Sequence, residues 1–316
     1  MPGISFIIIN YYTSHLVENL VSSIREVDSD NITEIIIVDN TTDDEASYRS
    51  QLESVRVHYT GENLGFARAC NIGAKLAANN NLVFINSDSL VWQPGFVELL
   101  IKSFNELPEK TIFTGRILNE HRRPVCNTFK FSTFIHVYFQ NSINRVWGAG
   151  IPFISNKVRA YLKDKSCEVD WISGAFLCIK KNYFFELGGF DENLFMYEED
   201  AELCYRAKQS NGKVVFIPDI NIIHYSGQSS KNNSELLALI GLRSALYFYK
   251  KRTNRFKAFL LEKLILLSWN FIYYLFVILS LIFPSPFLKK KIFWAKLVNI
   301  SRENLVRTNL LTYNAI

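Results

Sequence analysis

The run ISFIIIN, residues 4–10, consists almost entirely of isoleucine and phenylalanine and stops at Asn10. A short run without regular polar alternation is typical of a strand that is buried on both faces. Such strands occur in parallel sheets that are covered by helices on both sides. The run therefore predicts that the chain begins with the strand of a parallel sheet.

Two further apolar runs of strand length follow at residues 35–38 and 82–85, with a short strand expected at residues 55–59, and helical patterns separate them. We expect Thr13 or Ser14 to begin a helix that extends to about Val27, residues 41–45 to open a second helix, and residues 63–78 to form a third. Strands that alternate with helices indicate an α/β fold, with a mostly parallel, Rossmann-like sheet flanked by helices.

Polar side chains stand where three of these strands end, namely Asn10, Asp39, Asn40, Asn86 and Asp88. Ligands of open parallel sheets bind outside the carboxyl ends of the strands, so the recurrence favours a site, although a turn accounts for each residue alone. The chain has neither a GxGxxG nor a P-loop motif. A nucleotide would thus be held by side chains such as Asp39, and its phosphates by Mn²⁺ or Mg²⁺ on Asp88, because these ions prefer oxygen ligands.

The segment ENLGFARACNIG, residues 62–73, adds candidates for the same site. Gly65 permits a close backbone approach, Arg68 can reach a phosphate, and Asn63 and Asn71 offer amide groups. A helix with a glycine at its start and one solvated arginine explains the segment equally well.

The segment GGFDENLFMYEEDAELCYRA, residues 188–207, crowds carboxylates against aromatic side chains, an arrangement that is costly unless the charges are paired or used. Helical spacing begins near Tyr197, which places Glu199 and Asp200 in a first turn where the helix dipole favours ionised carboxylates. Glu202 and Arg206 are spaced to pair at i, i+4. An ionised, positioned carboxylate is what a general base requires, but a capped helix with an acidic first turn gives the same pattern.

Composition narrows the function classes. With 316 residues, 48% of them hydrophobic, and a net charge of +5, the chain can bury a large core and has no recognisable nucleic-acid-binding module. Five scattered cysteines without a CxxC pair indicate a reduced, cytosolic environment. The first residues give no signal-peptide pattern, because the apolar run is too short.

The last part of the chain differs in character. Residues 264–283 carry no charge over about the length that spans a bilayer, and lysines and arginines flank the stretch on both sides. Basic residues on both flanks favour attachment to an anionic membrane surface over a single span. A buried helical hairpin, broken at Pro284 to Pro286, is the second interpretation, and a true span is the third.

Taken in order, five segments resemble the large second family of inverting GT-A glycosyltransferases, and within it the bacterial rhamnosyltransferase-like branch. They are VDN (38–40), ENLGFARACNIG, FINSD (84–88), WISGAFLCIKK (171–181) and GGFDENLFMYEEDAELCYRAKQSNGKVVFIPDINIIHYSG (188–227). The resemblance covers roughly residues 4–252, and the ordered set is specific although each piece alone is weak. It implies a GT-A fold, a nucleotide-sugar donor, Mn²⁺ or Mg²⁺, and inversion at the anomeric carbon.

The resemblance also implies roles for single residues. Asp39 would contact the nucleotide base, Asp88 would bind the metal together with His224, and Asp200 would be the catalytic base with Glu199 in support. We further expect Trp171 and Gly174 to contact the acceptor, although Trp171 among apolar neighbours is equally well explained as core. Two departures from the family pattern stand out. The segment FINSD offers only one carboxylate for a metal. Glu202 stands where the family often has aspartate, and a harmless substitution on the helix surface would explain that difference.

These expectations combine into one functional hypothesis. Residues 1–252 would form the transferase domain, with about 1–118 binding the donor and about 119–252 carrying the acceptor site and the base, and residues 253–316 would form a helical, membrane-associating appendage. The protein would transfer L-rhamnose from dTDP-rhamnose to a lipid-linked saccharide in bacterial surface polysaccharide synthesis, at the inner face of the cell membrane. The alternatives are another UDP- or GDP-sugar donor, or a catalytically silent domain that binds carbohydrate or serves in assembly.

Overall fold

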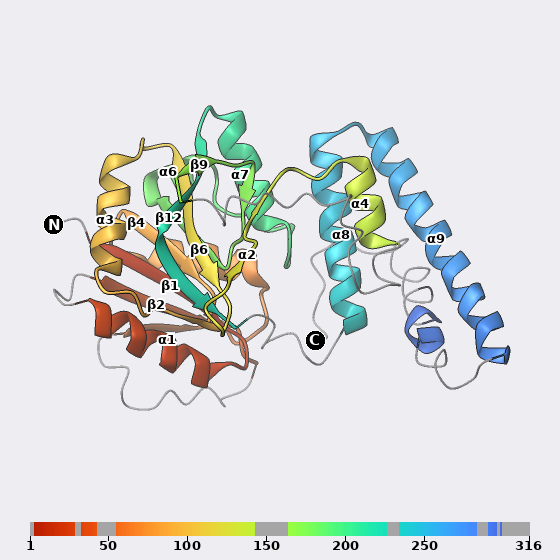
Figure 1. The fold of residues 1–316 in the computed structure, drawn as a ribbon, viewed down its shortest axis with the longest axis horizontal. Coiled ribbons are helices and arrows are strands. Elements are labelled where there is room, and N and C mark those ends of the chain that lie inside the picture. The colour runs from red at the N-terminus through yellow and green to blue at the C-terminus, as the bar shows by residue number, and fades with distance from the viewer. Residues whose placement is uncertain are drawn as a thin grey trace. The chain divides into compact units, whose positions relative to one another are not determined.

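The computed structural model describes residues 3–28, 33–42, 55–142, 164–225, 234–282, 290–295 and 298 (Figure 1). The chain divides into two compact units, the first made of Met1–Phe131 with Lys157–Lys231 and the second of Ser132–Asn156 with Asn232–Ala315. Helix α8 (Ser234–Arg252) thus belongs to the second unit, whereas the sequence placed the boundary at residue 252. All predicted site residues lie in the first unit.

The first unit is built on a mixed sheet, ten-stranded in the part of the chain that the structure describes. Its main path runs in the order β3-β2-β1-β4-β11-β6-β12-β5, with β7 beside β6 and β9 beside β12. Strands β3, β2, β1 and β4 are mutually parallel, whereas β11 runs antiparallel to both of its neighbours, β4 and β6. The strands are β1 (Ile4–Asn10), β2 (Thr33–Asp39), β3 (Val55–Tyr59), β4 (Asn81–Ile85), β5 (Ser89–Leu90), β6 (Thr111–Leu118), β7 (Pro124–Val125), β9 (Cys167–Glu168), β11 (Phe176–Lys180) and β12 (Lys213–His224). A separate pair is formed by β8 (Thr128–Phe129) and β10 (Trp171–Ile172).

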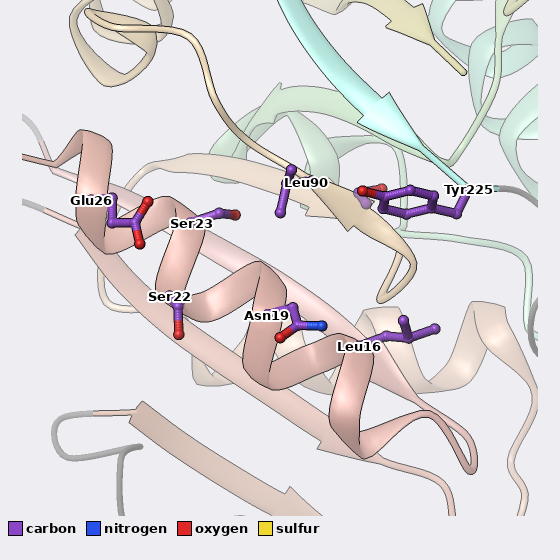
Figure 2. Close-up of a pocket in the computed structure, with 8 residues that line it drawn as sticks. Leu16, Asn19, Ser22, Ser23, Glu26, Leu90 and Tyr225 are labelled. Carbon is purple, nitrogen blue, oxygen red and sulfur yellow. The ribbon is translucent and has the colours of Figure 1, made fainter. Parts of the chain in front are cut away.

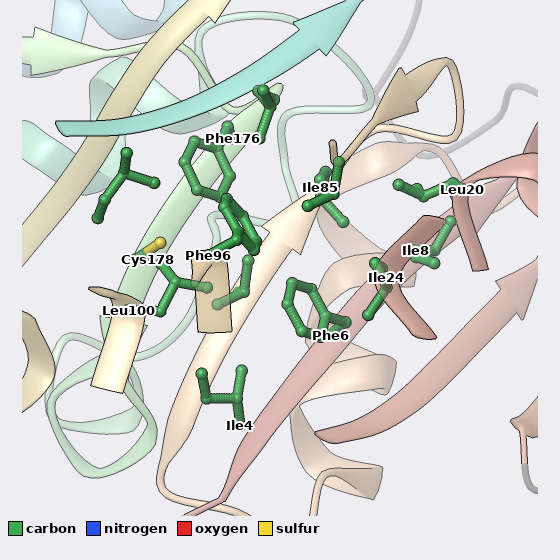
Figure 3. Close-up of a cluster of buried hydrophobic side chains, with 14 of the residues drawn as sticks. Ile4, Phe6, Ile8, Leu20, Ile24, Ile85, Phe96, Leu100, Phe176 and Cys178 are labelled. Carbon is green, nitrogen blue, oxygen red and sulfur yellow. The ribbon is translucent and has the colours of Figure 1, made fainter. Parts of the chain in front are cut away.

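Helices cover both faces of this sheet, as the apolar run of β1 predicted. Ile4, Phe6 and Ile8 pack with α1 (Ser14–Val27) and α3 (Phe96–Glu106) in one buried cluster (Figure 3). Ile7 points to a second cluster, which includes side chains of α2 (Phe66–Leu76), α6 (Lys181–Glu186) and α7 (Glu199–Gln209). Alternate residues of one strand therefore serve two cores.

Some element boundaries differ from the sequence prediction. Helix α2 begins at Phe66 and not at Asn63, because Gly65 takes a left-handed φ of 79° and the N–H of Phe66 donates to the carbonyl of Phe195 at 2.8 Å. The backbone leaves the helical path at that point. The helix predicted to open at residues 41–45 lies largely outside the described residues, as does the predicted hairpin break at Pro284 to Pro286.

The second unit has a hydrophobic core of its own. Helices α4 (Phe134–Asn141), α8 and α9 (Arg255–Ile282) contribute to it, with Leu242, Leu261 and Trp269 among the buried side chains. The indole N–H of Trp269 donates to the carbonyl of Asn141 at 2.6 Å. Within the described residues, α9 is the one helix that is long and apolar enough to cross a bilayer, by length and composition alone.

Candidate active site

The polar residues at the ends of β1 and β2 meet in one hydrogen-bonded group. Asp39 is fully buried, and its carboxylate accepts from Asn10 Nδ2 at 3.0 Å and from the backbone and hydroxyl of Thr41 at 2.9 and 2.7 Å. The N–H of Asn40 donates to the carbonyl of Asn10 at 2.9 Å. The side-chain amide of Asn40 donates to the carbonyl of Gly65 at 3.1 Å. The residues of β1 and β2 that are predicted to bind the nucleotide sugar are thus neighbours. Their contacts with a nucleotide stay predictions.

Two residues that the sequence analysis did not select join this group to the end of β4. The hydroxyl of Thr13 donates to Asn10 Oδ1 at 3.0 Å and lies 2.9 Å from the hydroxyl of Ser87. Thr13 and Ser87 are both buried. The sequence could have pointed to these hydroxyls, because each lies close to an asparagine at the end of a strand. Nothing in the local sequence shows, however, that residues 74 positions apart form a pair.

Asp88 and His224 form the candidate metal pair. His224 ends β12 and is in register with Ser89 of β5, which brings its Nε2 to 2.9 Å from Asp88 Oδ1. Both side chains are largely buried, and Asn86 Nδ2 lies 3.4 Å from the same imidazole nitrogen. Oxygen and imidazole donors fit Mn²⁺ or Mg²⁺, but among the described residues no group of three His, Cys, Asp or Glu side chains is placed to hold an ion. The pair can supply two ligands of such an ion, and metal binding here stays a prediction.

Asp200 lies in the first turn of α7, and two backbone N–H groups hold it. Gly174 N donates to Asp200 Oδ2 and Ala201 N to Asp200 Oδ1, each at 2.7 Å. A Cβ on Gly174 would lie 3.4 Å from the Cβ of Asp200, an ordinary van der Waals contact, so this approach does not itself require glycine. Gly174 and Ala175 precede β11, whose Phe176 pairs with Ile85, and Asn86 N donates to the carbonyl of Ala175 at 3.0 Å. The candidate base is therefore joined to the end of β4.

The environment of Asp200 changes its expected ionisation. Burial raises the pKa of its carboxyl to about 6, although the N–H groups of Gly174 and Ala201 act in the opposite direction. The sequence led us to expect an ionised carboxylate at a helix N-terminus, and a pKa of about 6 is compatible with ionised Asp200 near neutral pH. A carboxyl with a pKa of about 6 is well matched to accept a proton near neutral pH.

Glu199 is buried beside Asp200. Burial raises the pKa of Glu199 well above its usual range, and the neighbouring Asp200 charge raises it further. Its Oε2 is buried and has no hydrogen-bond partner among the described residues. A protonated Glu199 beside an ionised Asp200 avoids two buried like charges. The raised pKa favours the neutral form of Glu199, and its support of Asp200 stays a prediction.

The backbone that leads into α7 is strained. Tyr197 and Glu198 have φ values of 71° and 67°, in the left-handed region that side-chain-bearing residues rarely occupy. The N–H of Glu202 bonds to the carbonyl of Glu198 at 2.9 Å, which ties this turn to the helix. The two residues set the direction in which the first turn of α7, with Asp200, is presented.

The segment ENLGFARACNIG contacts the segment that precedes Asp200. Asn71 Nδ2 donates to the carbonyl of Phe190 at 2.9 Å and its Oδ1 accepts from the N–H of Phe190 at 2.9 Å. A Cβ on Gly65 would lie 2.4 Å from the carbonyl oxygen of Phe195, so glycine is required there. Asn63 Oδ1 accepts from the N–H of Gly65 at 3.1 Å. Arg68 lies at the surface, with Nε 3.6 Å from a carboxylate oxygen of Glu192.

Glu202 corrects one interpretation. The sequence analysis allowed a substitution on the helix surface, but the side chain is fully buried. Both of its oxygens accept from Arg206 Nε at 2.9 Å, and one also accepts from Nη2 at 2.6 Å. Arg206 continues to the carbonyls of Leu187 and Gly189, the latter at 2.7 Å. The pair fastens α7 to the turn after α6 and is structural.

Trp171 has partners of its own. Its ring stacks on Phe129 with centroids 4.1 Å apart, and its indole N–H donates to the carbonyl of Lys130 at 3.1 Å. These contacts fix the ring at the β8–β10 pair, and contact with an acceptor stays a prediction.

A separate open cavity of about 450 Å³ lies between α1 and β5 (Figure 2). Leu16, Asn19 and Glu26 of α1 line it together with Leu90 and Tyr225. The N–H of Tyr225 donates to the carbonyl of Asp88 at 2.9 Å, so the cavity adjoins the backbone of the candidate metal pair. No lysine, arginine or histidine is among the lining residues, which makes it a poor site for phosphate groups.

Comparison with known proteins identifies the family. The model of glycosyl transferase family 2 matches residues 5–168, more than half of the chain. An N-acetylglucosaminyl-diphospho-decaprenol L-rhamnosyltransferase from Mycobacterium tuberculosis is 22% identical over 209 residues, 62% of this chain and 67% of that protein. The dTDP-rhamnosyl transferase RfbF from Shigella flexneri is 26% identical over 219 residues, 67% of this chain and 66% of that protein.

Solved structures agree on the fold. The mannosyltransferase PcManGT from Pyrobaculum calidifontis, in complex with GDP-Man and Mn²⁺, matches with a TM-score of 0.54 at 13% identity, over 96% of this chain and 87% of that one. GalNAc-T7 with UDP, GalNAc and Mn²⁺ also matches with a TM-score of 0.54, at 16% identity, over 74% of this chain and 45% of that one. The chain thus has the GT-A fold, and it belongs to glycosyl transferase family 2.

Proposed function

We propose that the protein transfers L-rhamnose from dTDP-rhamnose to a saccharide acceptor, with inversion at the anomeric carbon, in the synthesis of a bacterial surface polysaccharide. The observation that carries the proposal is Asp200, which two backbone N–H groups hold at 2.7 Å and whose pKa lies at about 6. The sugar is suggested by the names of the relatives from Mycobacterium tuberculosis and Shigella flexneri. The decaprenol in the first name supports a lipid-linked acceptor.

In this mechanism Asp200 accepts the proton of the acceptor hydroxyl as its oxygen attacks the anomeric carbon. The N–H groups of Gly174 and Ala201 keep the carboxylate in place and stabilise its charge before transfer. Buried Glu199 remains neutral, so it does not compete for the proton. Trp171 and Gly174 border the acceptor.

On the donor side, Asp39 with Asn10 and Asn40 would contact the nucleoside, and Asn63, Gly65, Arg68 and Asn86 would surround the diphosphate. Arg68 is half-buried at the surface, and it would exchange its contact with Glu192 for a phosphate. Asp88 and His224 would hold Mn²⁺ or Mg²⁺, which when bound neutralises the charge that grows on the departing nucleoside diphosphate. About residues 1–118, together with His224, would thus supply the donor side, and the part of residues 119–252 that lies in the first unit would supply the acceptor site and the base.

A screen of nucleotide sugars tests the assignment. We expect the purified protein to bind and slowly hydrolyse dTDP-rhamnose in the presence of Mn²⁺ or Mg²⁺, and to lose hydrolysis on chelation by EDTA. The readouts are calorimetric binding and release of dTDP. A preference for a UDP- or GDP-sugar would overturn the assignment of dTDP-rhamnose as the donor. Binding of saccharides without turnover of any nucleotide sugar would show that the domain is catalytically silent.

The pKa of Asp200 predicts the pH dependence of transfer. A base works only when ionised, so kcat/KM is expected to fall as pH drops through about 6. The raised pKa also means that the folded state binds more protons than the unfolded state between about pH 4 and 6, so the free energy of unfolding falls as pH rises through that window. A kcat/KM profile from pH 5 to 8 checks the first effect. A flat profile down to pH 5 would contradict Asp200 as the base.

We also propose that the second unit holds the protein at the inner face of the cell membrane. One C-terminal helix that is long and apolar enough supports this placement. Attachment would bring the first unit close to a lipid-linked acceptor.

A further inference from the structure

Helix α9 has one face that is fully used inside the second unit. Its buried side chains recur every three or four residues and enter the core that α4 and α8 share, and they are Ala258, Leu261, Ile265, Trp269, Ile272 and Phe276. Polar bonds fix the same side: Trp269 donates to the carbonyl of Asn141, and the hydroxyls of Tyr138 and Ser268 lie 2.7 Å apart. This face has no room for lipid.

The opposite face of α9 is apolar as well, and it is exposed. We call it the outer face and define it by Phe256, Leu260, Leu267, Phe271, Tyr274, Ile278 and Leu281, again three to seven residues apart. Phe271 is 70% exposed, Leu267 67% and Leu281 77%. No charged residue occurs between positions 264 and 282. A contiguous apolar surface of this kind marks a membrane or protein interface.

We propose that α9 lies in the plane of an anionic membrane, with its outer face in the lipid interface and its buried face still packed on α4 and α8. This deepens the membrane attachment proposed above. It rests on that part of the proposed function, but it does not depend on which sugar is transferred.

The packing of α9 argues for this orientation and against a span. A spanning α9 would carry its partners into the hydrocarbon, yet α8 holds Arg243 near its middle and ends with Lys250, Lys251 and Arg252. The outer face extends from Phe256 to Leu281, about 38 Å at 1.5 Å per residue, which exceeds the hydrocarbon core of about 30 Å. An in-plane helix has no such length limit.

The charges beside the outer face indicate which partner covers it. Exposed cationic side chains border the first turns of α9, namely Lys250, Lys251, Arg255, Lys257 and Lys263. Lys263 Nζ lies 5.2 Å from the ring centroid of Phe259, so the charge and an apolar ring project together. Anionic headgroups complement this arrangement. A second copy paired in parallel through the outer face would bring the same cations together, which disfavours a parallel dimer.

Vesicle binding tests the proposal. The full chain is mixed with vesicles of phosphatidylcholine alone or with 30% phosphatidylglycerol, and bound protein is measured by flotation. We expect binding to the anionic vesicles that weakens in high salt. Phe271→Ser should lower the partition constant about tenfold, because the serine variant buries less apolar area in the lipid. Phe271→Leu should retain most of the binding, because leucine keeps most of that area.

Several outcomes separate this proposal from others. Phe185→Ser removes an exposed aromatic side chain of the first unit and should leave vesicle binding unchanged, as should Asp200→Asn. Release by alkaline carbonate supports the in-plane helix, and retention would overturn it in favour of a span. Equal flotation of Phe271→Ser and the unmodified chain, or a dimer in light scattering that Phe271→Ser dissociates, would overturn it too. Donor hydrolysis measured without vesicles reports separately on the proposed function.

Discussion

Replacement of Asp200 by asparagine is expected to lower kcat by about 10²- to 10⁴-fold, the range that a positioned general base typically contributes. Asparagine has nearly the same shape, and its Oδ1 can still accept from the N–H of Gly174 or Ala201. It loses the ability to take a proton, and one of the two N–H groups loses its acceptor, because an amide nitrogen cannot accept. Donor affinity should change little, because the donor residues cluster at the ends of β1, β2 and β4. Steady-state transfer and calorimetric donor binding, measured on the same preparation, check both statements.

Glu199→Gln is the matched control. It alters the adjacent buried carboxyl, which we expect to be neutral already, so the loss in kcat should be much smaller than for Asp200→Asn. Near-normal turnover of Asp200→Asn would remove Asp200 from the mechanism. A large loss in Glu199→Gln with little loss in Asp200→Asn would exchange the two roles.

Glu202→Ala is expected to lower the free energy of unfolding by about 3–5 kcal/mol, the usual result of removing one partner of a buried ion pair. Glu202 is fully buried, and Arg206 would lose all its charge-assisted bonds to it while staying bound to the carbonyls of Leu187 and Gly189. Denaturant titration followed by circular dichroism measures the change.

The chain offers a control with the same spacing. Lys102 and Glu106 also pair at i, i+4, at 3.9 Å, but both side chains are about two-thirds exposed. Glu106→Ala should therefore cost less than about 1 kcal/mol. Similar losses in the two variants would show that burial of Glu202 does not decide its contribution.

The parallel part of the fold follows directly from local sequence. β1, β2 and β4 are short, mainly apolar runs, and the helices between β1 and β2 and between β3 and β4 return the chain to the same edge of the sheet. The polar residues that end these strands meet for the same reason. Asn10, Asp39 and Asn86 were predictable because a parallel sheet brings the carboxyl ends of its strands together.

The antiparallel part was not predictable in the same way. β11 inserts between β4 and β6, and no local pattern shows that Gly174 will approach Asp200 or that Asn71 will bond to Phe190. The raised pKa of Asp200 and the burial of Glu202 also arise from non-local packing. Sequence spacing identified the i, i+4 pair of Glu202 and Arg206. Only the burial of the Glu202 side chain in the structure shows that the pair is structural.

The left-handed turn at Tyr197 and Glu198 sets stability against activity. Each residue holds a conformation that costs about 1–2 kcal/mol relative to an ordinary backbone. Glycine would remove that cost at either position, but it would also give more freedom to the chain that aims Asp200. Selection for heat resistance alone would therefore favour glycine at these positions, and such changes would lower the activity of Asp200 as a base. An enzyme evolved in the laboratory would have to gain its stability at other positions.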